Sequence, residues 1–211
     1  MVSFVDIHTH NPHCDTERIA NFRLGVDTIA PTTPFSAGIH PWDAEVVAEQ
    51  REGLLRQLTD LECIAIGEVG LDKACKVPLG MQTELFVAQL TIAAERNLPV
   101  IVHCVRATSE CLTLLAKHNI QKALFHGFIG SVEVAKEILS KGYFISYGFG
   151  SLRSPKTIEA LRHTPLDRLF LESDTAPHPI GELYAAATEI KGIDIELLKD
   201  TIKDNYTTFF R

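Results

Sequence analysis

Short apolar runs alternate with amphipathic stretches along most of the chain. The apolar runs have the length of β-strands, and the amphipathic stretches repeat apolar residues at helical spacing. The clearest helix is predicted over residues 80–97, where Leu85, Phe86 and Ile92 recur on one face. Strands that alternate with helices in this way indicate parallel strands joined by crossover helices.

We expect strands over residues 2–7, 18–24, 35–41, 63–69, 98–103, 122–126, 143–147 and 168–172. We expect helices over residues 43–61 (with Asp43 as its N-cap), 80–97, 109–118, 131–140, 155–162, 180–190 and 195–206. About eight strands favour an α/β fold of the TIM-type (β/α) barrel class over an open sheet. The first three strands lie too close together for crossover helices. We therefore predict a distorted or incomplete barrel with helices missing on its early side.

Length and composition limit the classes of protein that remain. We interpret residues 1–211 as one domain. The net charge of −7 argues against a wide basic surface for non-specific nucleic-acid binding, but not against a local anion site built on metal ions. Five irregularly spaced cysteines do not form a disulfide framework and favour a cytoplasmic location. We see no signal peptide, no transmembrane run and no sign of an obligate protein partner.

Residues with metal-ligating side chains stand at the ends of the predicted strands. His8 and His10 point to one face of the first strand, because side chains alternate along a strand. The other strand-end residues of this kind are His40, Glu68, His103, His126 and Asp174. The carboxyl ends of the strands meet at one mouth of a barrel, where active sites lie. The pattern therefore predicts a shared metal site.

The predicted ligand set exceeds what one ion needs. Glu68 can bridge two cations, with one group of ligands on each side: His8, His10 and Asp174, and His103 and His126. Two such ions can hold a hydroxide and stabilise the attacking and leaving oxygens of a phosphoester. Nitrogen and oxygen ligands without thiolate suit Zn, Mn or Mg. We predict that Glu68 and Asp174 are catalytic, Asp174 as general base, and that His40 and Arg106 steady the phosphate.

Six blocks in order resemble the TatD family of metal-dependent hydrolases: Asp6–His10, Gly38–Pro41, Ala65–Asp72, Pro99–Cys104, Phe125–Phe128 and Leu171–Asp174. The resemblance implies a TIM barrel, a two-metal centre and phosphoester hydrolysis, often as a Mg-dependent 3′→5′ DNA exonuclease acting on single-stranded ends. Some relatives hydrolyse D-aminoacyl-tRNA esters. The resemblance places metal ligands at His8, His10, Glu68, His103, His126 and Asp174, and a substrate-phosphate contact at His40.

The chain departs from the family pattern on the substrate side. The segment between His10 and Gly38 is short, Val105 replaces a frequent Arg, and residues 175–179 replace a polar loop. Three hypotheses therefore stay open. The first is a two-metal phosphoesterase or deoxyribonuclease. The second is an ester, amide or lactone hydrolase acting on a small molecule or an aminoacyl-tRNA ester, and the third is a binding protein that holds metals for stability.

Some other polar and aromatic residues have two interpretations. Trp42 can stack on a base or pack a helix onto the barrel. Glu172 shares the face of Asp174 and can orient a ligand. Arg153 fits a solvated surface, and His178 can line the mouth. His13 and Cys14 fit an exposed loop.

Overall fold

A computed structural model describes residues 3–11, 16–32 and 34–210. The chain divides into two compact units. The terminal unit contains residues 1–20 and 125–211, and the central unit contains residues 21–124. Two strands carry the chain from one unit to the other, β2 (Glu17–Arg23) and β6 (Ala123–Phe125). His13 and Cys14 lie outside the described residues.

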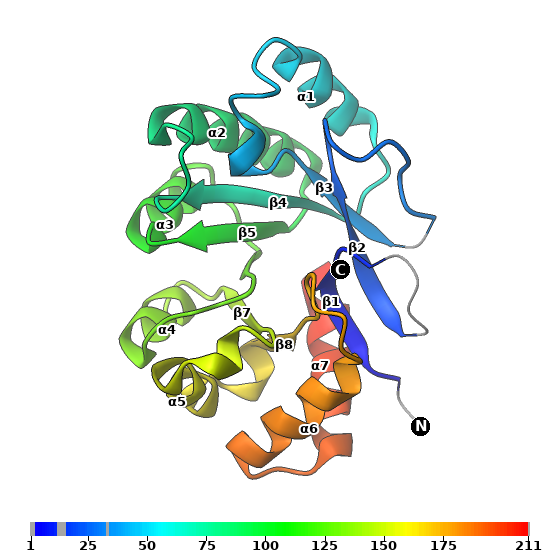
Figure 1. Cartoon of the computed structure of the whole chain (residues 1–211), viewed down its shortest axis with the longest axis vertical. Helices are drawn as coiled ribbons and strands as arrows, with labels where there is room; N and C mark the ends of the chain where they lie inside the picture. The colour runs from blue at the N-terminus through cyan, green and yellow to red at the C-terminus, as the bar shows by residue number, and fades with distance from the viewer. Residues whose placement is uncertain (1–2, 12–15, 33, 211) are drawn as a thin grey trace. The chain divides into compact units, whose positions relative to one another are not determined.

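The terminal unit is built from short parallel strands and the helices that follow them (Figure 1). Its strands are β1 (Val5–Thr9), β7 (Phe144–Tyr147) and β8 (Leu169–Leu171). Its helices are α4 (Val132–Leu139), α5 (Pro155–His163), α6 (Ile180–Lys191) and α7 (Ile195–Phe210), with 3₁₀ turns η2 (Ser151–Arg153) and η3 (Leu166–Arg168). The start of β2 pairs in parallel with β1, and β7 pairs in parallel with β8.

The central unit repeats the same alternation. Its strands are β3 (Phe35–Gly38), β4 (Ala65–Asp72) and β5 (Val100–Val105). Its helices are α1 (Arg51–Asp60), α2 (Leu79–Arg96) and α3 (Thr108–Lys117), with the 3₁₀ turn η1 (Pro41–Asp43). The strands β3, β4 and β5 pair in parallel in that order, and Figure 1 shows β4 and β5 side by side.

A glycine lets β4 and β5 approach closely next to a predicted ligand. Gly70 has a φ of +149° and is paired with His103. A Cβ atom at this position would lie 2.0 Å from the His103 carbonyl oxygen. Only glycine avoids this overlap. The backbone of β5 at His103 can therefore lie this close to β4 only because residue 70 is glycine.

Two buried glutamines on α2 hold the ends of β3 and β4. The amide of Gln89 accepts from the Ile39 N–H at 2.7 Å and donates to the Ile39 carbonyl at 3.1 Å. Gln82 makes the same pair of hydrogen bonds to the backbone of Asp72, at 2.7 and 3.0 Å. These side chains satisfy backbone groups where the strand ladder stops. They thereby fix the positions from which His40 and Asp72 project.

The strands and helices lie close to the predicted ranges, with one larger difference. The helix predicted over residues 43–61 begins at Arg51, so its predicted start and N-cap are wrong. Arg23 binds the Asp43 carboxylate through two hydrogen bonds, of 2.5 and 2.8 Å, and this occupies the cap group. Among the described residues no helix lies between β1 and β3, as predicted for the early side. No described helix is both long and apolar enough to cross a membrane.

Candidate metal centre

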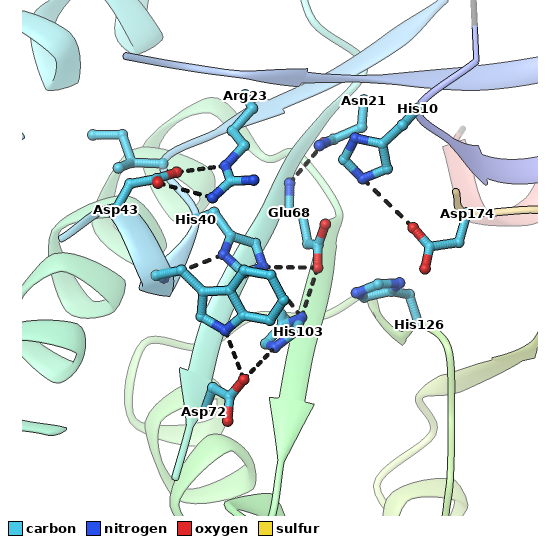
Figure 2. A network of polar contacts seen from close by, with 12 residues as sticks. His10, Asn21, Arg23, His40, Asp43, Glu68, Asp72, His103, His126 and Asp174 are labelled. Carbon is cyan, nitrogen blue, oxygen red and sulfur yellow. Dashed lines mark hydrogen bonds and ion pairs between the residues drawn. The ribbon is translucent and has the colours of Figure 1, made fainter. Parts of the chain in front are cut away.

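Three of the predicted ligands come together in the terminal unit. His8, in β1, is fully buried, whereas the side chains of His10 and Asp174 are partly exposed. One donor atom from each residue lies within 4.8 Å of the other two. His10 Nε2 lies 3.6 Å from Asp174 Oδ1, a pair drawn in Figure 2. Two imidazoles and a carboxylate are a common donor set for a catalytic divalent cation.

The backbone fixes Asp174 against β1. Its N–H donates to the His8 carbonyl at 3.0 Å, and its own carbonyl accepts from the His10 N–H at 3.0 Å. Asp174 has a φ of +52°, which is uncommon for a residue with a side chain. Such a conformation persists only where the surroundings hold it, and it is frequent at functional sites. These hydrogen bonds keep the carboxylate beside the two histidines.

His126 is held by a buried carboxylate in the same unit. The Glu172 side chain is fully buried, and its Oε1 lies 3.2 Å from His126 Nδ1. The Ser146 hydroxyl donates to the other oxygen of Glu172. Burial alone would raise the pKa of Glu172, but the contacts with His126, His8 and Ser146 outweigh it and hold that pKa below its usual value. An ionised Glu172 accepts from Nδ1–H, so Nε2 is the nitrogen through which His126 would bind a metal.

A second cluster lies in the central unit, where His40 follows β3, Glu68 lies within β4 and His103 lies within β5. Glu68 Oε1 lies 3.1 Å from His40 Nε2 and 2.6 Å from His103 Nδ1. Figure 2 shows these three side chains linked in a row. One donor atom from each lies within 4.8 Å of the other two. The structure thus groups Glu68 with both histidines within one unit.

The hydrogen bonds of His40 determine which of its nitrogens carries a proton. The Trp42 backbone N–H donates to His40 Nδ1 at 3.2 Å, so Nδ1 is an acceptor. Nε2 then carries the hydrogen that it donates to Glu68. Burial lowers the pKa of His40, which favours this neutral tautomer. A buried imidazole with Nε2–H is a hydrogen-bond donor, which suits contact with a phosphate oxygen better than metal binding.

Asp72 and Trp42 also belong to the central cluster, although neither was predicted to lie beside the metal ligands. Asp72 Oδ2 lies 3.2 Å from His103 Nε2 and accepts from the indole N–H of Trp42 at 2.7 Å. Burial would raise the pKa of Asp72, but the hydrogen bonds from Trp42, Ala74 and His103 lower it. The even spacing of Glu68 and Asp72 along β4 puts them on one face, and this signal was available in the sequence.

A bidentate ion pair supports the same cluster. Arg23, at the end of β2, binds both oxygens of Asp43 and lies 5.9 Å from the centre of the Trp42 ring. Bidentate arginine–carboxylate pairs have a fixed geometry. The pair ties η1 to β2 and thus positions the indole ring, which remains half exposed. Asn21 on the same strand accepts from the Glu68 N–H at 2.9 Å.

Within the described residues, Arg106 and Cys104, at the end of β5, point away from the central cluster or make no contact with it. Arg106 is exposed and has a φ of +55°, and none of its side-chain contacts in the described structure joins it to the cluster. Cys104 is half buried and lies 3.7 Å from the Thr108 hydroxyl on α3. A hydrogen bond from Cys111 lowers the pKa of the Cys104 thiol to about 7. Cys104 therefore packs against α3, as the alternation of side chains along the strand predicts.

The donor sets fit divalent cations. Each cluster offers imidazole nitrogen and carboxylate oxygen, and neither includes a thiolate. Asp72 contacts one nitrogen of His103, and Glu172 contacts one nitrogen of His126. A histidine that binds a metal commonly has such a carboxylate at its other nitrogen. The arrangement can bind cations, present a carboxylate for proton transfer and donate a hydrogen bond from His40.

Comparison with known families identifies the protein class. A family model described as TatD related DNase matches residues 7–211. The chain belongs to the TatD family. The metal-dependent hydrolase YabD of Bacillus subtilis, which is uncharacterized, is 36% identical over 195 residues, covering 82% of this chain and 76% of YabD. The 3′-5′ ssDNA/RNA exonuclease TatD of Pectobacterium carotovorum is 35% identical, covering 68% of this chain and 57% of that protein.

The fold class follows from solved structures. YJJV, a TatD homologue from Escherichia coli, matches with a TM-score of 0.82 and 23% identity, covering 100% of this chain and 99% of YJJV. The TatD-family chain accordingly has the TIM-type barrel fold predicted from its sequence, and it is a metal-dependent hydrolase. The two clusters are candidates for the metal sites of this hydrolase.

Proposed function

We propose that this protein is a metal-dependent phosphodiesterase that acts on nucleic-acid ends, as a 3′→5′ deoxyribonuclease would. The observation that carries the proposal is the cluster of His8, His10 and Asp174, whose donor atoms lie within 4.8 Å of one another. Residues 1–211 form one hydrolase domain in this proposal, in agreement with a single family match over residues 7–211. A cytoplasmic location stays a prediction from the cysteine content.

The metal ligands of the proposal are those predicted from the sequence: His8, His10, Glu68, His103, His126 and Asp174. Two Zn, Mn or Mg ions are the expected cofactors. Divalent cations at such sites polarise a phosphoryl oxygen and lower the pKa of water. The bridging role of Glu68 stays a prediction.

The residues around the ligands have separate roles. Asp174 is the proposed general base, because its carboxylate is partly exposed and its position is fixed by backbone hydrogen bonds. His40 is the proposed phosphate donor, because its Nε2 carries a hydrogen in a buried site. Arg106 is exposed at the end of β5 and is proposed to bind a phosphate farther along the substrate.

Nucleic acid is the favoured substrate because of the relatives. One is named as an exonuclease on single-stranded DNA and RNA, and another, from Homo sapiens, is named as a 3′-5′ RNA nuclease. The net charge of −7 favours substrate recognition by local cations rather than by a broad basic face. Single-stranded ends need few phosphate contacts and suit such a site.

The test is a reconstitution of the metal-free protein with Mg, Mn and Zn. Each metal is offered with short single-stranded DNA, an aryl phosphodiester and an aryl carboxyl ester. We expect metal-dependent release of mononucleotides and a loss of at least about a hundredfold in kcat for Asp174→Asn, since general-base catalysis contributes about 10²–10⁴-fold. The matched control is Asp167→Asn, an exposed aspartate in η3.

The other outcomes discriminate among the hypotheses. Cleavage of the carboxyl ester alone would replace the proposal with an ester, amide or lactone hydrolase. Cleavage of the aryl phosphodiester but not of DNA would support the phosphodiesterase reaction and refute nucleic acid as the substrate. Equal rates for wild type and Asp174→Asn would refute the assignment of the general base.

A further inference from the structure

A cavity of about 540 Å³ opens beside Asp174 in the terminal unit. It is bounded by the turns after β6, β7 and β8, and its lining includes Gly127, Gly148, Phe149, Arg153 and His178. The volume lies in the range of small-molecule sites. Asp174 also lines the cavity, so a molecule in it lies next to the candidate metal ligands of this unit.

Arg153 brings a positive charge to this cavity. It is exposed at the end of η2, and the described residues provide no carboxylate within ion-pair distance of its guanidinium. The other charged or titratable residues of the lining are Glu172, Asp174 and His178. Glu172 is committed to His126 and Ser146, and His178 Nδ1 lies 3.9 Å from Glu182 on α6. An unpaired guanidinium in a cavity is suited to bind a phosphate.

An aromatic wall lies beside this charge. Phe149 is half buried, and its ring centre lies 5.2 Å from that of His178. Ile129, which is 64% exposed, forms a further apolar part of the lining. Aromatic rings that are accessible in this way stack on nucleobases with little preference for sequence. The cavity thus combines a phosphate-binding group with a base-binding surface.

Two glycines keep the floor of the cavity open. A Cβ atom at Gly127, where φ is +54°, would lie 3.2 Å from Glu172 Oε1. A Cβ atom at Gly148 would lie 3.4 Å from the Glu172 carbonyl and 3.5 Å from its Cγ. A side chain at residue 127 would press on Glu172, and one at residue 148 would touch it at ordinary contact distance, so either would occupy space above Glu172. Their absence leaves room for a planar ligand next to Asp174.

We propose that this cavity binds the nucleotide next to the scissile phosphodiester of a single-stranded nucleic acid. Arg153 pairs with a phosphate of that nucleotide, and Phe149 stacks on its base. The inference rests on the proposed function, because it takes Asp174 to mark the point of cleavage. It assigns nucleotide binding to Phe149 and Arg153, which follow β7, whereas the sequence favoured a solvated surface for Arg153.

Binding without cleavage tests the inference. A fluorescent oligothymidylate is titrated into the Asp174→Asn protein, and the Kd is measured by anisotropy over a series of salt concentrations. We expect Arg153→Gln in this background to raise Kd about tenfold, the effect of losing one hydrogen-bonded ion pair. The slope of log Kd against log salt should fall by about 0.7, because one phosphate contact is lost. Phe149→Leu should raise Kd about tenfold without changing the slope, whereas Phe149→Tyr should bind like the parent.

Arg56→Gln is the matched control. Arg56 is an exposed arginine on α1 that lines neither described cavity. Its replacement changes the net charge by the same amount as Arg153→Gln but leaves the cavity intact. Equal Kd values and slopes for Arg153→Gln and Arg56→Gln would overturn the proposal, even if the wild-type protein cleaves DNA. Failure of the wild-type protein to cleave any phosphodiester, with the Arg153 and Phe149 effects intact, would instead overturn the proposed function and leave the nucleotide site standing.

Discussion

Glu172 and Asp72 have the same relation to two histidines. Each is a buried carboxylate that contacts one nitrogen of a predicted ligand, Glu172 that of His126 and Asp72 that of His103. Each is hydrogen-bonded by a further side chain, from Ser146 or Trp42. Such partners fix the orientation of an imidazole and increase its basicity. We infer that the two carboxylates position the histidines for metal binding.

Replacement of Glu172 tests this role at the residue scale. Glu172→Gln keeps the shape but removes the negative charge beside His126. We expect the affinity for the metal to fall about 10–100-fold, measured by calorimetric titration of the metal-free protein with Zn and Mn. Glu189→Gln, an exposed residue on α6, is the control for the loss of one charge. Unchanged affinity in Glu172→Gln would refute the positioning role.

At the scale of secondary-structure elements, buried polar side chains on the helices hold the strands through hydrogen bonds to the strand backbone. Gln82 and Gln89 hold β4 and β3 from α2. In the terminal unit, Asn205 on α7 donates to the carbonyls of Leu166 at 2.7 Å and Leu169 at 2.9 Å, where η3 leads into β8. The hydroxyl of Tyr184 on α6 exchanges hydrogen bonds with the backbone of Val5 in β1. Val5 begins β1 and Leu169 begins β8, so these contacts hold the starts of the two strands that lead to His8 and Asp174.

Loss of the Asn205 amide should destabilise the terminal unit. Asn205→Ala leaves one buried and one partly buried carbonyl group without this donor, which costs about 1–3 kcal/mol. At about 2–4 °C per kcal/mol for a chain of this size, the melting temperature should fall by up to about 12 °C. Differential scanning calorimetry measures the change, and Asp204→Ala on the exposed side of α7 is the control. If both variants melt alike, the amide does not hold β8.

At the scale of the whole molecule, the candidate ligands of the terminal unit come from distant parts of the sequence. His8 and His10 lie near the start of the chain, whereas Asp174 follows the last strand. The N–H groups of His10 and Asp174 already connect β1 to this segment. A cation bound by the three side chains would add a second connection, which exists only in the folded chain. Metal binding and folding should therefore be coupled.

Removal of metal should lower thermal stability. At a metal concentration about 100-fold above Kd, binding contributes about 2.7 kcal/mol, equivalent to roughly 5–11 °C in melting temperature. We expect Zn or Mn to raise the melting temperature of the metal-free protein by about this amount, and His10→Gln to remove most of the increase. His163→Gln, an exposed histidine on α5, is the control. A full increase in His10→Gln would exclude His10 as a ligand.

The sequence by itself determined the class of fold and the chemistry of the site. Apolar runs of strand length depend on local patterning, so most strands and helices lie near their predicted ranges. The helix predicted from Asp43 was wrong at its start, because Arg23, twenty residues away, binds the capping carboxylate. Local pattern alone cannot show which distant side chain competes for a polar group.

Tertiary structure decided the partners of the predicted residues. The ligand types at strand ends were visible in the sequence, because strand ends meet in a parallel barrel. The pairing of His103 with Asp72, the tautomer of His40 and the cavity around Arg153 were not visible. These features depend on which side chains the turns bring within a few ångströms, and packing between distant segments sets those distances.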